Sequence, residues 1–168
     1  INANDLSAVS ISLDNDKTGA VSTASVIFTV VNEVPSGGKI HIIFPSGFTL
    51  PSTINNPTIS ASSGLTGNVI TASKSGTRTI VVSFGAGTSL SDNAVDVTIG
   101  IPGCVNPRIS QTTGTFQIET RNSTSPGALI DSKTSGVTTY IDANDLSAVS
   151  ISLDNNKTGA VSTASVIF

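Results

Sequence analysis

Two segments near the ends of this 168-residue chain are almost identical. Residues 1–28 and 141–168 match at 26 of 28 positions. The stretch of chain from the start of the first segment to the start of the second is far longer than one unit of a solenoid. It has the length of a whole domain. We therefore interpret residues 1–140 as one complete repeat and residues 141–168 as the first strands of the next repeat.

The pattern of apolar residues predicts an all-β fold. Val, Ile, Thr and Ser are abundant whereas Lys and Glu are scarce, which suits pleated strands better than helices. Apolar and polar residues alternate in short runs such as residues 8–14 and 39–44, and Gly, Ser, Pro and Asn separate the runs. Nine or ten such strands at regular spacing indicate an immunoglobulin-like β-sandwich.

Charge and motif content exclude several classes of function. The net charge is −3 and the eight Lys and Arg residues are scattered, so no basic stripe is available for nucleic acid. No apolar run approaches the ~20 residues that a membrane-spanning helix needs. The chain has no phosphate-binding glycine loop, nucleophile elbow or paired-cysteine motif. The only histidine, His41, alternates with apolar neighbours and is expected on the outer face of its strand. We therefore expect no enzyme and no catalytic residues.

The duplicated segment is the candidate junction between subunits, and its partner is expected to be another copy of the same sequence. Two versions remain open. Either the chain simply continues into the next domain, or one alternating strand inserts into the open sheet of a neighbour, where main-chain hydrogen bonds and side-chain pockets would hold it. The apolar residues of that strand and of its second copy are Val9, Ile11, Leu13, Val149, Ile151 and Leu153.

Acidic and amide residues at the start of the second copy resemble the linker through which cadherin-type repeats bind calcium. Asp142, Asn144 and Asp145 could supply some of the six to eight oxygens that Ca²⁺ prefers. The first copy has Asn2 in place of Asp142, however, and Asx residues are common turn formers. We therefore expect no cofactor. Calcium is the alternative, with these three residues as its candidate ligands.

Two sequons mark candidate N-glycosylation sites at Asn122 and Asn156. The first copy lacks the second sequon because Asp16 stands in place of Asn156. The single cysteine, Cys104, could bridge two chains or remain a free thiol in a secreted protein. Its place at the end of an apolar strand favours packing as a small hydrophobic side chain.

Three stretches resemble a recurrent immunoglobulin-like repeat of very large extracellular microbial proteins. They are KIHIIFPSGFTL at residues 39–50, VTIGIPGCVNP at 97–107 and TGTFQIETRNSTSPGALIDS at 113–132. The resemblance covers residues 38–132 and rests on turn and core positions rather than on a site. Such repeats occur in bacterial surface and adhesin-like proteins and in secreted proteins of microbial eukaryotes. The chain is also similar to protomers of glycosylated extracellular fibrils, although Cys104 departs from the usual aliphatic residue.

The resemblance implies an extracellular, repetitive and mostly structural protein. We therefore expect a structural subunit of an extracellular fibre or surface array, in which repeats are joined head to tail and glycans are a further partner. The alternative is an adhesin module that grips a glycan or a host protein through loops at one end of the sandwich. Such sites usually expose aromatic side chains, and here Tyr140 is the only tyrosine and tryptophan is absent.

Overall fold

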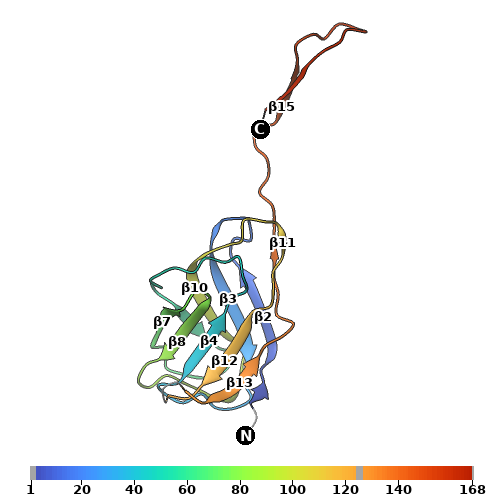
Figure 1. The fold of residues 1–168 in the computed structure, drawn as a ribbon. Helices are drawn as coiled ribbons and strands as arrows, with labels where there is room; N and C mark the ends of the chain where they lie inside the picture. The colour runs from blue at the N-terminus through green and yellow to red at the C-terminus, as the bar shows by residue number, and fades with distance from the viewer. Residues whose placement is uncertain (1–2, 124–126, 168) are drawn as a thin grey trace.

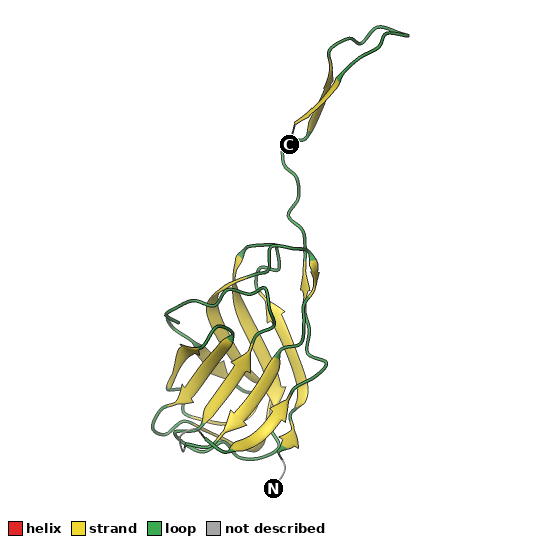
Figure 2. Cartoon of the chain, in the orientation of Figure 1, coloured by secondary structure: helices red, strands yellow, loops and turns green. Residues whose placement is uncertain are grey.

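The structure is a computed structural model that describes residues 3–123 and 127–167. Within these ranges the chain forms strands, turns and loops and no helix, which confirms the all-β prediction (Figure 1; Figure 2). The same ranges therefore hold no helix suited to crossing a membrane. In chain order the strands are β1 Asn4–Asp5, β2 Ser7–Leu13, β3 Val21–Thr29, β4 Lys39–Ile43, β5 Thr58–Ser60, β6 Ser63–Thr66, β7 Ile70–Ser75, β8 Thr79–Phe84, β9 Ser89–Val95, β10 Val97–Val105, β11 Gln111–Thr112, β12 Gln117–Arg121, β13 Leu129–Lys133, β14 Tyr140–Ile141, β15 Ser150–Leu153 and β16 Ala164–Ile167.

Two sheets form the body of the molecule, in agreement with a β-sandwich (Figure 2). The larger sheet has the strand order β1-β13-β12-β4-β8-β7, and the smaller one has the order β2-β3-β10-β5. Strands β1 and β13 are parallel, and the other neighbours in these two sheets are antiparallel. The first two strands therefore belong to different sheets, so the start of the chain contributes to both layers.

The core lies between the two sheets. Strands β3, β4 and β8 each bury every second residue, as period-2 alternation predicts. Phe44, Phe48 and Phe116 meet edge to face with ring centroids 5.2 to 5.5 Å apart, an arrangement that aromatic pairs prefer. These phenylalanines come from the stretches that carry the family resemblance, so core packing accounts for part of it.

The chain passes from the larger sheet to the smaller one between β1 and β2. The Leu6 N–H donates to the Ser132 carbonyl of β13, and immediately afterwards β2 pairs with β3. The crossing is made by a register shift between Ser7 and Ser10, with Ala8 at a φ of 49°. A non-glycine residue with positive φ is uncommon and here accompanies a bulge that redirects the strand.

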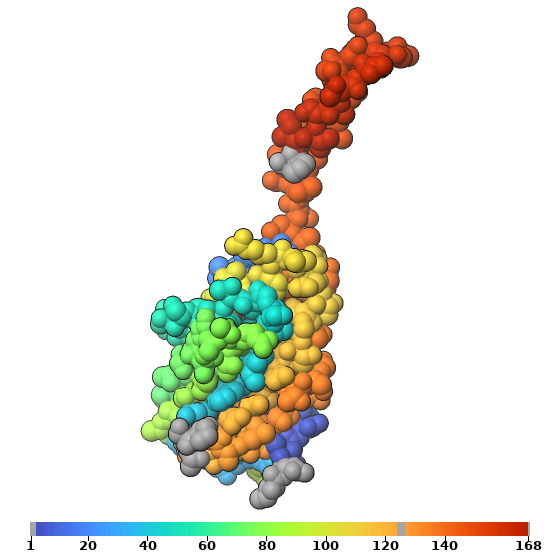
Figure 3. Space-filling model, viewed as in Figure 1, coloured from blue at the N-terminus to red at the C-terminus, as the bar shows by residue number. Residues whose placement is uncertain are grey.

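The second copy of the duplicated segment forms a separate hairpin of β15 and β16, which projects from one end of the sandwich (Figure 3). Its register is the register of β2 and β3, since Ile151 pairs with Val166 as Ile11 pairs with Val26. Ala148 has a φ of 54°, close to that of its counterpart in the first copy. The hairpin therefore takes its shape from local sequence, without the rest of a sheet.

Contacts with the sandwich continue slightly beyond residue 140, the expected end of the first repeat. Ile141 is completely buried and pairs with Gln111, and Asp142 forms a parallel bridge with Lys17. Contacts with the sandwich continue as far as Asn144. The segment expected to begin the next repeat is thus attached to the end of the first one.

Candidate inter-repeat interface

The two copies of the duplicated segment differ sharply in burial although their sequences are nearly the same. The exposed fractions of three equivalent pairs are 1% for Leu6 against 70% for Leu146, 8% for Ile11 against 70% for Ile151, and 0% for Val26 against 53% for Val166. The first copy packs into the core, and the second presents the same apolar side chains to solvent. Apolar side chains that are buried in the first copy are therefore exposed in the second.

The six candidate strand residues fall into two groups. In the first copy Ile11 is buried, and Val9 and Leu13 are partly buried against the core. Strand β2, which carries them, is already paired with β3. The equivalents Val149, Ile151 and Leu153 are exposed. The apolar side chains of the second copy are thus the ones left exposed for packing into another sheet.

The two copies are joined by a set of contacts that we call the clip, formed by residues 16–18 of the first copy and residues 142–144 of the second. The Asp142 N–H donates to the Asp16 carbonyl at 2.9 Å, and the Thr18 N–H donates to the Asp142 carbonyl at 2.9 Å. The Lys17 ammonium lies 2.6 Å from a carboxylate oxygen of Asp142 and also donates to the Ala143 carbonyl. These bonds fix the direction in which the chain leaves the sandwich.

The last residue of the clip is bound through its side chain. The Asn144 side-chain amide donates to the Thr18 carbonyl at 3.1 Å. On the other side of the exiting segment, β14 pairs with β11 and buries Ile141. The exiting chain is thus held from two directions at the same end of the sandwich.

The two charged groups of the clip stabilise each other's ionised forms. Hydrogen bonding to Asp142 raises the pKa of Lys17 above its ordinary value, and the charges of Asp145 and Asp16 act in the same direction. The Lys17 bond in turn lowers the pKa of Asp142, helped by the Ala143 N–H. The pair is therefore fully ionised at neutral pH, and because both groups are solvent-accessible it directs geometry more than it adds stability.

The proposed calcium ligands lie in or beside the clip. One carboxylate oxygen of Asp142 is bound to Lys17, and the Asn144 side chain is used as a donor toward Thr18. Asp145 is exposed, and its charge acts on Lys17. No group of three His, Cys, Asp or Glu side chains is placed to hold a metal ion within residues 3–123 and 127–167. A cation at this position would compete with the Lys17 ammonium.

The Asn106-Pro107 pair that follows β10, which we call the NP motif, binds the residues of the clip that belong to the first copy. The Asn106 side-chain amide donates to the carbonyls of Asn15 and Lys17 at 2.7 and 3.0 Å, and the Gly19 N–H donates to the Pro107 carbonyl. Asn106 is buried, and its side-chain oxygen finds no donor among the described residues. Neither Lys17 nor Asn106 was singled out by sequence reasoning, although the NP motif was the available signal for Asn106.

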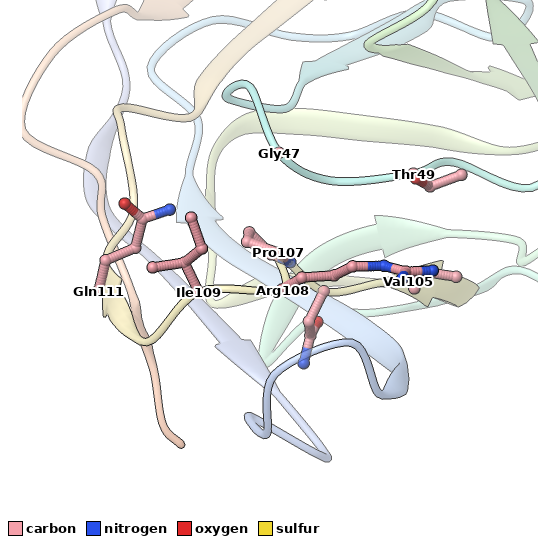
Figure 4. A pocket seen from close by; sticks show the side chains of 8 residues that line it. Gly47, Thr49, Val105, Pro107, Arg108, Ile109 and Gln111 are labelled. Carbon is pink, nitrogen blue, oxygen red and sulfur yellow. The ribbon is translucent and has the colours of Figure 1, made fainter. Parts of the chain in front are cut away.

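A cavity of about 450 Å³ adjoins this support. Figure 4 shows the loop of Gly47 and Thr49 on one side and the segment from Val105 to Gln111 on the other. Because Gln111 pairs with Ile141, the cavity lies at the end of the sandwich from which the second copy leaves. It therefore belongs to the same end face as the clip.

Of the two sequon asparagines, one closes a loop and one is exposed in a turn. The Ala128 N–H donates to the Asn122 side-chain oxygen at 2.8 Å, whereas Asn156 is exposed in the β15–β16 turn. Thr124 of the first sequon lies outside the described residues. Glycosylation at either position remains a prediction.

Cys104 and His41 occupy ordinary structural positions. Cys104 is completely buried, and burial raises the pKa of its thiol to about 12. His41 is half-buried on β4 between the fully buried Ile40 and Ile42, as the alternation predicts. Burial, followed by the nearby charge of Arg121, lowers the pKa of His41.

Comparison with known proteins gives no further guide, because no family model, curated protein or solved structure matches this chain. The geometry of the duplicated segment and the clip is therefore what bears on the function of this chain.

Proposed function

We propose that this protein is a structural subunit of an extracellular fibre or surface array built from immunoglobulin-like repeats joined head to tail. The exposed hairpin of β15 and β16 carries the proposal. It repeats the sequence, register and turn of a hairpin that is buried in the first repeat, and it projects its apolar side chains into solvent. An isolated two-stranded hairpin is marginal in water, so its stable state lies in a second sandwich.

The strand order supports the immunoglobulin-like part of the proposal. The smaller sheet β2-β3-β10-β5 corresponds to strands A-B-E-D, and β13-β12-β4-β8-β7 corresponds to G-F-C-C′-C″ of a variable-type domain. The connections differ in the middle of the chain, where β5 precedes β7 and β8. The correspondence therefore concerns which strands are neighbours in each sheet and does not extend to the order in which the chain forms them.

The hairpin is held away from the sandwich of its own repeat. To replace β2 and β3 there, Asp145 would have to reach Ser132, the partner of Asp5 in the first copy. Strand β2 alone spans ~20 Å, whereas the three residues after Asp142 reach only ~10 Å. Releasing the clip would not suffice, because β14 would also have to leave β11 and expose Ile141. The acceptor is thus another repeat, on the same chain or on another copy.

Removing the first copy tests the proposal. A chain of residues 29–168 keeps the exposed hairpin but leaves one edge of β10 unpaired, since β3 normally covers it. We expect it to assemble head to tail into filaments visible by electron microscopy. The same chain carrying Ile151→Asp is the matched control and should not assemble. A compact, folded monomer of residues 29–168 would contradict the proposal.

The alternative function, an adhesin module, is favoured by one observation. The end-face cavity carries Arg108 and Gln111 in its lining, which are suited to binding hydroxyl or carboxylate groups of a sugar. A glycan array probed with the whole chain separates the two functions. Binding abolished by Arg108→Ala would support the adhesin, and a blank array would leave the fibre as the stronger proposal.

A further inference from the structure

The first copy of the duplicated segment shows how the second would be bound in a following repeat. Asn4 and Asp5 form β1 and pair with Asp131 and Ser132 of β13. The next residue, Leu6, donates its N–H to Ser132 and is buried. Residues equivalent to these, beginning at Asn144, would therefore be part of the next sandwich.

The same residues are already occupied at the end of the first repeat. Asn144 donates its side-chain amide to Thr18, and Ala143 accepts a bond from Lys17. Asn144 is the equivalent of Asn4, which begins β1. Its side chain bonds to the preceding repeat, and its backbone would pair with β13 of the following one. These two sets of contacts use different atoms and can coexist.

We infer that consecutive repeats abut directly, with Asn144 shared between them and no free linker residue. This inference rests on the proposed head-to-tail function and specifies its interface. The occupant of the end face is the base of the next repeat, the end at which its parallel strands β1 and β13 both begin. It applies equally whether the rest of that sandwich lies on the same chain or on another copy.

Apolar side chains that are exposed at the end face are consistent with a surface that the next repeat covers. Val21, Ile109 and Tyr140 are each more than half exposed. Val21 pairs with Val105 beside the cavity, and the Tyr140 hydroxyl lies 3.0 Å from the Ser110 hydroxyl. Ile109 lines the end-face cavity and Tyr140 directly precedes Ile141, so these side chains lie at the end from which the chain leaves. A repeat held against this point would cover them.

The shared residue sets an upper limit on the axial spacing. Asn4 and Asn144 are equivalent points one repeat apart, and Asn144 touches Thr18. Fourteen steps along the chain separate Asn4 from Thr18, and at no more than ~3.6 Å per residue they span at most about 50 Å. With the contact between the Asn144 side chain and Thr18 added, repeats should follow one another every ~60 Å or less.

A two-repeat protein tests this interface. It consists of the full chain followed by a second copy of residues 29–140, which supplies the remaining strands of the second sandwich. Residual dipolar couplings should fit one alignment tensor for both sandwiches. Inserting Gly-Ser-Gly-Ser between Asn144 and Asp145 should let the two sandwiches tumble separately, so that each requires its own alignment tensor. The magnitude of the tensor of one sandwich should then fall several-fold. The same insertion at Gly76, where the surrounding space is open, is the matched control and should leave one tensor.

The outcomes separate the inference from the function on which it rests. Two folded sandwiches that tumble independently without any insertion would overturn the direct contact and leave the head-to-tail function standing. If residues 150–167 stay unprotected from hydrogen exchange in the two-repeat protein, the proposed function fails and the inference fails with it. A single tensor that survives insertion after Asn144 would also overturn the inference.

Discussion

The Lys17 ammonium lies 2.6 Å from a carboxylate oxygen of Asp142, a residue 125 positions away in the chain. Asp142 is also one of the two positions at which the duplicated segments differ. The other is Asp16, whose carbonyl accepts the Asp142 N–H. Both differences between the copies thus fall on one contact between a repeat and the chain that leaves it. In the proposed array, junctions would therefore differ from one another at these two positions.

Neutralising this contact should loosen the junction without unfolding the sandwich. Asp142→Asn introduces the residue present at position 2, and in the two-repeat protein we expect greater inter-repeat motion by NMR relaxation. The pKa of Asp142 is lowered from its ordinary value of 3.8. The contribution of the pair is therefore complete above that value and is lost as the pH falls through the lowered pKa. An Asp142 carboxyl that titrates at or above 3.8 would contradict the contact.

Equivalent valines in the two copies should respond differently to one substitution. Val26→Asp places a charge in the core and should destabilise the chain by more than ~4 kcal/mol. Val166→Asp should change the free energy of unfolding by less than ~0.5 kcal/mol, because Val166 is exposed. Appending residues 29–140 should make the second substitution severe as well. Urea denaturation followed by circular dichroism measures all three, and equal effects of the two substitutions in the 168-residue chain would be inconsistent with the structure.

The stability of the sandwich should depend on Asp131, which is buried at its base. Its carboxylate accepts bonds from the Val31 and Asn32 N–H groups and from the Asn32 side chain, at 2.6 to 3.1 Å. Asp131→Ala leaves these donors without their acceptor and should lower the free energy of unfolding by about 3 kcal/mol. The exposed Asp92→Ala is the control and should change it by less than ~0.5 kcal/mol. Comparable denaturation midpoints for the two variants would argue against this role.

The thiol of Cys104 should be unreactive in the folded chain. It is fully buried, and burial raises its pKa to about 12, so little thiolate is present at pH 8. We expect a thiol reagent to label it only as fast as the chain unfolds, and at once in denaturant. Rapid stoichiometric labelling without denaturant, or a disulfide between chains in natural material, would show instead that Cys104 serves as a link.

Sequence patterns predicted the features that depend on neighbouring residues. Alternation identified the strands that bury Ile40, Ile42 and Val26, and the start of the duplicated segment lies within a few residues of the point at which the chain leaves the sandwich. The hairpin register is also local, because the Asp14 side chain bonds to Ser22 and Thr23 in the first copy as its equivalent does in the second. The structure has more strands than expected because several are only two to four residues long.

The clip could not be predicted in this way. Lys17 and Asp142 are brought together only when β14 is laid beside β11, and no local pattern encodes a contact over that separation. The parallel pairing of β1 with β13 is hidden for the same reason, since Asn4 and Asp131 lie at opposite ends of the repeat. The NP motif was visible in the sequence, but the role of Asn106 depends on where the β2–β3 turn folds.

Amide hydrogen exchange in β15 and β16 is the most direct measurement of whether the second copy is an unfinished part of a sandwich. It should be recorded for the 168-residue chain and for the same chain followed by residues 29–140. We predict fast exchange in the first protein and, in the second, protection equal to that of β2 and β3. Exchange that remains fast after the added residues have folded would show that the hairpin does not complete a second sandwich.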